Sequence, residues 1–397
     1  MKTILIVDDE LQILKSFRRL FLGREYDLIC MQSGEAALEA LADNPVHMII
    51  TDMQMPDMNG YELLSVVKEK YPGVFRIILS GNTDEQQILK AIHKGIANLY
   101  IMKPWNNKEI IRMLDQVFET ETLLQDRKLL EEFNNLSELP TLKSSYQRII
   151  EMTESDADLA DITAAIELDQ SIASKILRIA NSAYFGVKTG SVRQAVLFLG
   201  FNNIRNVIIS TTFFDFMMIP PDSKRFAQSL QEHAFLTNKL MHMIYKQHLH
   251  KEVPEQASAA GLLHNIGMLY MLGRFGGRFS TVIRECIAQG TDLLAREREE
   301  FPVSHTEAGG FLLRWWEIPY PIVEAALYCF NPLSESIINS ELVCAVHIAR
   351  YFACELLHIH FPCAVYEEAF QKLGLEKEEI ENSIKKISGF KKNTAVY

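Results

Sequence analysis

Cysteine is sparse in this chain, and no two cysteines have the spacing of a metal site. None of the six stands in a C-x-x-C pair. A disulfide framework or a thiolate zinc site is therefore not expected, and the composition fits a reducing compartment such as the cytoplasm. The cysteines are Cys30, Cys286, Cys329, Cys344, Cys354 and Cys363.

Long apolar runs and regions of positive charge are also missing. Only four consecutive apolar residues precede Asp8, too few for a signal peptide. The longest apolar stretch, residues 207–221, is short and contains Asp215, so a membrane helix is not expected. The formal net charge is −11, and acidic residues outnumber basic ones in the first 118 residues and in the remainder alike. Binding to nucleic acid or to anionic lipid is therefore not expected.

The length of 397 residues suggests two or three domains of about 150 residues each. In roughly the first 115 residues, short apolar runs alternate with helical patterns such as Tyr61–Lys70 and Glu85–Lys94. This alternation predicts an α/β domain with a doubly wound, five-stranded parallel sheet whose faces are both covered by helices. The expected strands are Ile4–Val7, Leu28–Met31, Met48–Ile50, Ile77–Leu79 and Leu99–Met102.

The rest of the chain has helical spacing only. Residues 107–135 have the pattern of one long polar helix without a clean heptad, and we expect residues 121–135 to connect two domains. A homodimer contact through this helix stays open. From residue 136 to residue 397 apolar residues recur at helical spacing, which predicts an all-α domain with a C-terminal extension.

Polar side chains follow four of the five expected strands. They are Asp8 and Asp9, Asp52, Ser80, and Lys103. In a doubly wound sheet of order 2-1-3-4-5, the carboxyl ends of strands one, three, four and five are neighbours. We therefore expect three carboxylates, one hydroxyl and one ammonium around a single crevice.

This combination predicts a site for magnesium and a phosphoryl group. Three close carboxylates need a counter-cation, and oxygen-only ligands in a partly open site suit Mg²⁺. The hydroxyl and the lysine suit phosphate oxygens, and Asp52 can act as a nucleophile. Each piece alone has a plainer explanation, since Asp8 and Asp9 could be the favourable acids of a helix N-terminus. Their joint placement at four strand ends makes that explanation improbable.

Residues 1–120 resemble the receiver domain of two-component response regulators, which has a flavodoxin-like fold. The matching motifs are Ile-Val-Asp8-Asp9-Glu10, Asp52-Met-Gln-Met-Pro56-x-x-x-Gly60, Ser80-Gly81 and Tyr100-Ile-Met-Lys103-Pro104. The resemblance implies that a sensor histidine kinase or a phosphotransfer protein phosphorylates Asp52. It also implies Mg²⁺ bound by Asp9, Asp52 and the Gln54 carbonyl, with Asp8 acting through water.

The same resemblance assigns the switching residues. Ser80 and Lys103 would sense the phosphoryl group, and Tyr100 stands at the family's rotating aromatic position. An added phosphoryl group brings negative charge and hydrogen-bond acceptors, which would draw Ser80 and Lys103 inward. Tyr100 could then enter the space that Ser80 leaves, and the surface around it would take one of two forms.

Histidine is concentrated in the helical part, where seven of the eleven lie between His233 and His347. A metal phosphohydrolase of the HD type needs an adjacent His-Asp pair, an upstream histidine and a distant aspartate. This chain has His264 followed by Asn265, a much poorer metal ligand, and has His233 upstream. A buried histidine within a helical core is the simpler interpretation.

Residues 130–350 resemble the HDOD domain, a relative of HD phosphohydrolases that generally lacks the catalytic metal set. The matching segments include Ala180-Asn-Ser-Ala-Tyr-Phe-Gly186, Ala260-Gly-Leu-Leu-His264-Asn265-Ile-Gly267 and Phe301-Pro-Val-Ser-His305-x-Glu-Ala-Gly309. Against metal-binding relatives, Cys329-Phe330 replaces paired histidines and Arg350 replaces a late aspartate. His233, His264 and His305 then remain without a carboxylate, so we expect satisfied core histidines at a degenerate site.

Of three functions that such a chain could have, the preferred one is a phosphorylation-controlled response regulator. Its HDOD domain is not an enzyme and acts on an unknown downstream protein. The alternative is a receiver-controlled, metal-dependent phosphohydrolase of a cyclic dinucleotide or another nucleotide phosphate. A transcription factor is disfavoured, because the chain has no basic recognition helix and a net negative charge.

Overall fold

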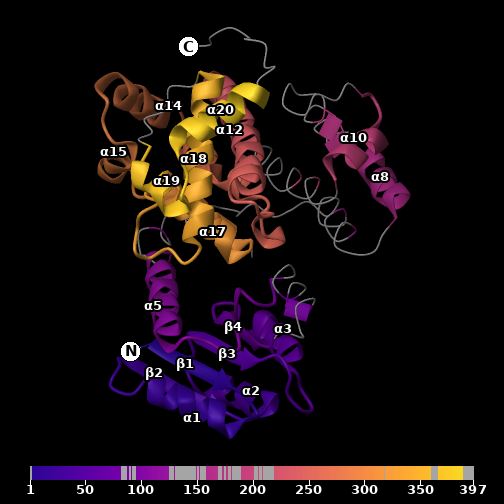
Figure 1. The fold of residues 1–397 in the computed structure, drawn as a ribbon, viewed down its shortest axis with the longest axis vertical. Coiled ribbons are helices and arrows are strands. Elements are labelled where there is room, and N and C mark those ends of the chain that lie inside the picture. The colour runs from indigo at the N-terminus through magenta and orange to yellow at the C-terminus, as the bar shows by residue number, and fades with distance from the viewer. Residues whose placement is uncertain are drawn as a thin grey trace. The chain divides into compact units, whose positions relative to one another are not determined.

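The computed structural model describes most of the chain as two compact units (Figure 1). One unit comprises residues 1–117 with 317–320, and the other comprises residues 118–316 with 321–397. The described residues are 2–81, 87–88, 91, 95–124, 129, 149, 152, 158–168, 172–173, 176–177, 180, 189–200, 204, 208, 219–316, 318–358 and 365–387.

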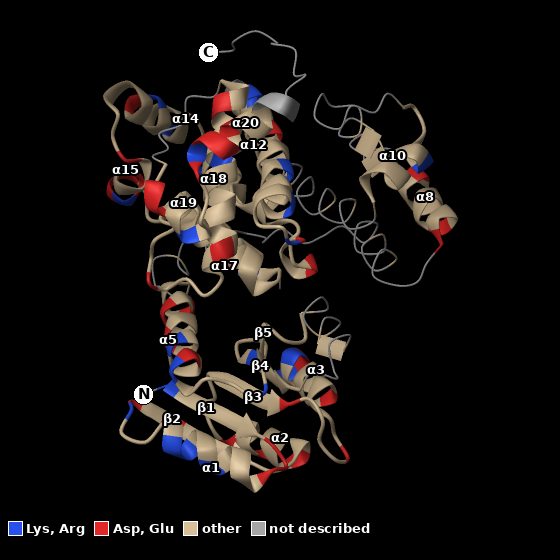
Figure 2. Ribbon diagram, in the orientation of Figure 1, with Lys and Arg blue, Asp and Glu red and all other residues tan. Residues whose placement is uncertain are grey.

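The first unit is built on a five-stranded parallel sheet of order β2-β1-β3-β4-β5. This confirms the predicted α/β class, and each expected strand falls within an observed one. Figure 2 shows charged residues at or near the ends of the strands. The strands are β1 (Lys2–Val7), β2 (Tyr26–Met31), β3 (Met48–Asp52), β4 (Phe75–Ser80) and β5 (Leu99–Met102).

Helices with well-defined starts flank the sheet. The expected helix Tyr61–Lys70 is observed as α3, which begins with a capping box in which Asn59 and Glu62 bond each other's backbone N–H at 3.0 and 3.1 Å. This box satisfies two of the N–H groups that every helix start leaves without a partner. The expected helix Glu85–Lys94 lies mostly outside the described residues. The flanking helices are α1 (Leu11–Leu20), α2 (Gly34–Asp43), α3 (Gly60–Lys70) and α5 (Asn107–Leu124).

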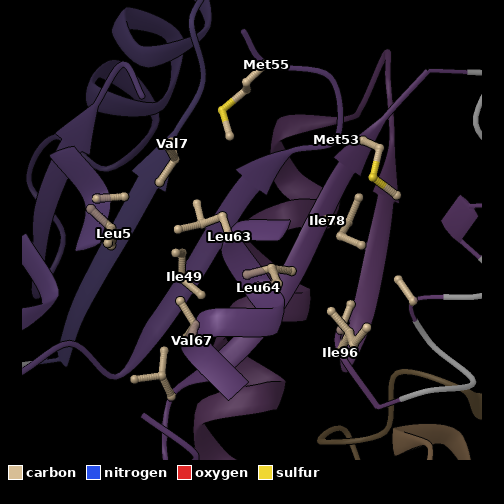
Figure 3. Packing of buried hydrophobic residues seen from close by; sticks show 14 of the residues in the cluster. Leu5, Val7, Ile49, Met53, Met55, Leu63, Leu64, Val67, Ile78 and Ile96 are labelled. Atoms are coloured by element: carbon tan, nitrogen blue, oxygen red, sulfur yellow. The ribbon is translucent and has the colours of Figure 1, made fainter. Parts of the chain in front are cut away.

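Alternate strand residues build the apolar layer on one face of the sheet (Figure 3). Leu5, Ile49 and Ile78 pack with Leu63 and Val67 of α3, and all five are fully buried. The strand residues between them point to the opposite face by the period of two, and they are fully buried as well. The sheet is therefore covered on both faces, as its apolar strands predicted.

The second unit is helical throughout its described part, which confirms the predicted all-α domain. Within the described residues no helix is both long and apolar enough to cross a membrane. The helices are α8 (Leu159–Leu168), α10 (Val192–Leu199), η1 (Pro221–Ser223), α12 (Lys224–Met243), the π-helix η2 (Ile244–His248), η3 (Glu255–Ala257), α13 (Ala260–Leu263), α14 (Ile266–Gln289), α15 (Leu293–Glu300), α16 (His305–Trp315), α17 (Tyr320–Tyr328), α18 (Ser340–Leu357), α19 (Glu367–Leu373) and α20 (Lys377–Ile387).

Two backbones meet without side chains between α14 and α16. A Cβ atom built on Gly267 would lie 1.8 Å from the carbonyl oxygen of His305 and 2.6 Å from the amide nitrogen of Gly309. Only glycine fits at such a distance. The contact fixes the first turns of α14 and α16 against each other. His264 and Asn265 directly precede α14, and His305 is the first residue of α16.

The end of α5 belongs to the second unit, which begins at Phe118. Arg314 donates from Nε to Glu121 Oε1 at 3.0 Å, and Thr120 and Tyr328 share a hydrogen bond of 3.1 Å. The helix ends its described course at Leu124, so most of the connecting helix expected over 121–135 lies outside the described residues. That connection and the exact domain limits stay predictions.

We expect the ion pair of Glu121 and Arg314 to contribute measurably to the stability of the second unit. A double-mutant cycle with Glu121→Gln and Arg314→Met should give a coupling of about 1 kcal/mol or more in urea unfolding, because both side chains are mostly buried. The control cycle uses the exposed pair of Lys251 and Glu341, which should couple by less than about 0.5 kcal/mol. Equal coupling in the two cycles would contradict this expectation.

Candidate functional site

The carboxyl ends of the strands bring together the predicted acidic site. Asp8 directly follows β1, Asp52 and Ser80 are the last residues of β3 and β4, and Lys103 directly follows β5. Asp8, Asp52 and Ser80 are all buried. The Lys103 ammonium donates to Asp8 Oδ2 at 3.1 Å and also to Asp52 Oδ1. One cation therefore joins two carboxylates from separate strands.

Burial and hydrogen bonding set the charges of this cluster. Burial raises the pKa of Asp8, although the backbone N–H of Glu10 and the Lys103 ammonium partly counter this effect. Burial opposes the charge of Lys103, but its hydrogen bonds to Asp52 and Asp8 raise its pKa overall. The lysine is therefore a firmly charged cation, and it stabilises ionised carboxylates beside it.

The loop after β3 shapes the surroundings of Asp52. The second carboxylate oxygen of Asp52 accepts the backbone N–H of Gln54 at 2.9 Å. Gly60 starts α3, and a Cβ built on it would lie 2.1 Å from the carbonyl oxygen of Asp52. Glycine at this place lets α3 begin directly against the backbone of Asp52, which accounts for a glycine at position 60.

Two of the remaining predicted residues, Asp9 and Tyr100, are open to solvent, whereas Ser80 is buried. Asp9 is exposed, and Tyr100 is 40% exposed on β5. The Ser80 hydroxyl donates to the carbonyl of Gly81 at 3.2 Å, and the Ser80 carbonyl accepts the backbone N–H of Lys103 at 2.7 Å. Ser80 is thus linked through the backbone to the residue that reaches Asp52.

The acidic site offers carboxylate oxygens as donors for a cation. Among the described residues, no three histidine, cysteine or acidic side chains lie close enough together to hold a metal. Asp8 and Asp52 nevertheless converge on one cation, the Lys103 ammonium. Two converging carboxylates with an exposed third beside them are oxygen donors of the kind that Mg²⁺ takes. The residues therefore fit magnesium.

Two histidines of the second unit, His233 and His264, line a small cavity. The rings of His233 on α12 and His264 lie 5.4 Å apart, and the Arg350 guanidinium carbon lies 3.8 Å above the Phe330 ring. The cavity is about 10 Å³, the room of roughly one water molecule. Its lining residues are Leu230, His233, His264, Asn265, Met268, Phe330 and Arg350.

Each histidine uses one ring nitrogen to hold its place. His233 Nε2 donates to the Arg350 carbonyl at 3.1 Å, and His264 Nδ1 donates to the Gly261 carbonyl at 2.8 Å. Burial lowers the pKa of His233 to about 4 and the pKa of His264 well below its usual value. The rings are therefore neutral at neutral pH. Among the described residues, the Nε2 atoms of His264 and His305 have no hydrogen-bond partner. The expectation of satisfied core histidines stays a prediction.

A carboxylate that the sequence did not reveal stands beside His305. Glu297 on α15 is fully buried, and both its oxygens lie 2.8 Å from His305 Nδ1. It also accepts the backbone N–H of His305 at 2.9 Å. Glu297 belongs to the acidic run Glu297-Arg-Glu-Glu300, in which nothing marked it from its exposed neighbours. A carboxylate that orients a histidine through Nδ1 is typical of histidine ligands and of catalytic histidines.

Asn265 forms a hydrogen bond between two helices. Its Nδ2 donates to the Leu230 carbonyl at 3.0 Å and so ties the start of α14 to α12. Arg350, at the place aligned with a metal-binding aspartate, brings a positive charge to the cavity wall. These residues do not fit a divalent metal.

Comparison with known proteins assigns both units. Residues 4–115 match the family model of the response regulator receiver domain, and residues 139–332 match that of the HDOD domain. The chain is 32% identical over 117 residues to the two-component response regulator ORR3 of Oryza sativa, which covers 29% of this chain and 88% of the rice protein. The unit with the five-stranded parallel sheet and the buried acidic site at its carboxyl edge is therefore a receiver domain.

Each of the other similar proteins matches only a part of this chain. The hydrogenase transcriptional regulatory protein HoxA of Cupriavidus necator is 33% identical over 129 residues, which are 32% of this chain and 27% of that protein. A solved structure from Shewanella amazonensis, whose name suggests a phosphohydrolase, is 19% identical with a TM-score of 0.51 over 67% of this chain and 96% of its own, and it supports the fold alone. The chain spans between 27% and 50% of the length of the first curated relatives it matches.

The chain belongs to the response regulators of two-component systems, with a receiver domain followed by an HDOD domain.

Proposed function

We propose that a sensor histidine kinase or a phosphotransfer protein phosphorylates Asp52, and that this switches a non-catalytic HDOD output domain. The observation that carries the proposal is the convergence of Asp8, Asp52 and the Lys103 ammonium at the carboxyl edge of the sheet. A buried carboxylate beside a fixed cation is a suitable acceptor for a phosphoryl group.

The chemistry follows from the contacts of Asp52. One carboxylate oxygen attacks the phosphorus atom of the donor, the new O–P bond forms, and the bond to the donor's leaving atom breaks. Lys103 stays in contact with the carboxylate and offers its ammonium to the incoming phosphate oxygens. Asp8, Asp9, Asp52 and the Gln54 carbonyl would hold Mg²⁺, which neutralises phosphate charge when bound.

The switch would start from Ser80 and Lys103. The Ser80 hydroxyl donates to the neighbouring Gly81 carbonyl at 3.2 Å, and phosphate oxygens are stronger acceptors than this carbonyl. Inward movement of this hydroxyl and of Lys103 would change the environment of Tyr100 on β5. The surface that carries Tyr100 would then bind a downstream protein in one of the two states.

For the HDOD domain we favour recognition through protein contacts over catalysis. Arg350 at the cavity and Asn265 in a structural hydrogen bond leave no carboxylate among the cavity-lining residues for a metal. The alternative of a metal-dependent phosphohydrolase is favoured by one feature, the Glu297 carboxylate that orients His305. Metal analysis and an assay on cyclic dinucleotides distinguish the two. Bound transition metal, with turnover abolished by His264→Ala, would establish the enzyme and refute our preference.

A capture experiment tests the whole proposal. The full chain is immobilised and exposed to lysate of its own host with and without acetyl phosphate and magnesium, and bound proteins are identified by mass spectrometry. We expect a partner whose capture changes several-fold with the phosphodonor for the wild type and not for Asp52→Asn. Identical capture in all four samples would refute the switch.

Ser80→Ala should separate phosphorylation from switching. The variant keeps Asp52 and Lys103, so we expect the wild-type mass increase with acetyl phosphate, because the hydroxyl is not a nucleophile in the reaction. Hydrogen–deuterium exchange of the β5 peptide should then lose its response to the phosphodonor. The control is Ser65→Ala on α3, whose hydroxyl bonds the Tyr61 carbonyl within its own helix at 2.7 Å. An unchanged β5 response in Ser80→Ala would exclude Ser80 as the sensor.

A further inference from the structure

A carboxylate is buried between α17 and the start of α18 without a charged partner. Glu324 on α17 is fully buried. Its Oε1 accepts the backbone N–H of Ile338 at 2.8 Å, and its Oε2 accepts the backbone N–H and the side-chain Nδ2 of Asn339 at 2.9 and 2.7 Å. All three donors are neutral, and among the described residues no cation forms an ion pair with Glu324. Burial therefore disfavours its negative charge.

The hydrogen bonds of Glu324 fix residues 334–339, the segment that precedes α18. Asn339 is the N-cap residue of α18, but its side chain makes no capping hydrogen bond within that helix. It bonds Glu324 instead, so a carboxylate on α17 holds the residues from which α18 starts. The same segment bonds the end of α5, because the Ser336 hydroxyl donates to Glu119 Oε2 at 2.7 Å.

Proton uptake by Glu324 is incompatible with this arrangement. Its described hydrogen-bond partners are all donors, which suits an ionised carboxylate because that group only accepts. A protonated carboxyl group carries an O–H that needs an acceptor, and a buried O–H without one is unfavourable. One of the N–H donors must then move away, or the Asn339 amide must turn so that its Oδ1 accepts the new hydrogen.

We propose that Glu324 is a pH-sensitive switch: the ionised carboxylate holds residues 334–339 against α17, and the protonated form releases Asn339 and loosens the segment. Burial raises the pKa of Glu324 to about 7 although its three hydrogen bonds lower it, so the switch responds to pH near neutrality. All the residues involved lie in the second unit, and the switch is therefore independent of phosphorylation at Asp52.

The charges on neighbouring elements do not set this behaviour. The pKa of Glu324 is shifted by burial and by its hydrogen bonds to Ile338 and Asn339. Tyr328 lies one turn further along α17, and its pKa is raised mainly by burial, with a contribution from the charge of Glu324. The other titratable or charged groups on the surrounding elements each have a different partner: Glu119 on α5 bonds Ser336, Glu121 on α5 pairs with Arg314 on α16, Glu341 on α18 pairs with Lys251, and His347 on α18 bonds the Cys329 carbonyl.

Hydrogen–deuterium exchange of the full chain tests the release of the segment without any variant. After correction for the intrinsic pH dependence of exchange, we expect the protection of the Ile338 and Asn339 amides to fall by about 10-fold from pH 8 to pH 6, because the ionised fraction of Glu324 falls by that factor. The control is the Ala308 amide on α16, which bonds the Ser304 carbonyl at 3.0 Å and should not respond. Unchanged protection of Ile338 and Asn339 would overturn the proposal.

Urea unfolding of the full chain tests whether Glu324 is the group that titrates. Its folded-state pKa lies above the usual value of 4.5, so its contribution to stability is complete below that value and is lost as the pH rises through about 7. Protonation therefore stabilises the unit as a whole while it releases this segment. From pH 5 to pH 8 we expect the folding equilibrium constant of the wild type to fall by about 70-fold relative to Glu324→Gln, which cannot ionise.

Glu335→Gln is the matched control for this pH profile. It removes an exposed carboxylate from the same segment and should keep the profile of the wild type. Parallel profiles of the wild type and Glu324→Gln would show that Glu324 does not titrate in this range and would overturn the proposal.

Discussion

Asp52→Asn will abolish the covalent phosphorylation that the wild-type chain undergoes with acetyl phosphate and magnesium. The wild type should gain about 80 Da, the mass of one phosphoryl group, and lose it again in hydroxylamine. The amide of asparagine lacks the anionic oxygen that now meets Lys103 and attacks phosphorus. We expect the modified fraction to fall by at least about 100-fold, measured by intact-mass spectrometry.

The matched control is Asp57→Asn in the same loop. Asp57 is exposed, and its backbone has a φ of 63°, a conformation that asparagine tolerates well. This variant removes the same charge a short distance along the chain and should keep the full mass increase. If Asp52→Asn still gained the phosphoryl group, or if Asp57→Asn lost it, Asp52 would not be the acceptor.

Gly267→Ala should unfold or grossly destabilise the second unit. The new methyl group would lie 1.8 Å from the carbonyl oxygen of His305, where two helix backbones touch and no flexible side chain can move away. Relief requires α14 and α16 to separate, which disrupts packing along both helices. We expect a loss of more than about 4 kcal/mol in the free energy of unfolding, measured by circular dichroism in urea.

Gly190→Ala serves as the control for this substitution. A Cβ at Gly190, just before the cap of α10, meets no atom within 4 Å, so its effect should stay within about 0.5 kcal/mol. The phosphorylation of Asp52 in Gly267→Ala should remain, because the receiver unit is a separate compact unit. A Gly267→Ala variant as stable as Gly190→Ala would contradict the direct backbone contact.

The short apolar runs in the sequence predicted the sheet, because its strands are buried on both faces and are therefore apolar throughout. Arg76 shows the limit of such patterns. It lies inside β4 at 1% exposure, and its guanidinium bonds the carbonyls of Val74, Gly95 and Ile96. A sequence pattern treats a charged residue as the end of a buried strand, so the predicted strand began only after it, at Ile77.

The two candidate sites differed in how far they could be predicted. The acidic site could be predicted from the sequence because parallel strands place their carboxyl ends on one edge of the sheet. The topology alone therefore brings Asp8, Asp52 and Lys103 together. The helical site depends on how several helices cross, which no local pattern specifies. Alignment placed Phe330 and Arg350 near the histidines, but the contact of Glu297 with His305 arises from the bend between α15 and α16.

The touching backbones of Gly267 and Gly309 also bear on how this helical domain can change over evolutionary time. They fix the backbone positions of His264, Asn265 and His305, whichever side chains fill the space between these residues. Exchange of a few side chains such as Arg350 can therefore change the charge and shape of the cavity lining while the main chain keeps its course. The chemistry of this interior can change without a new fold.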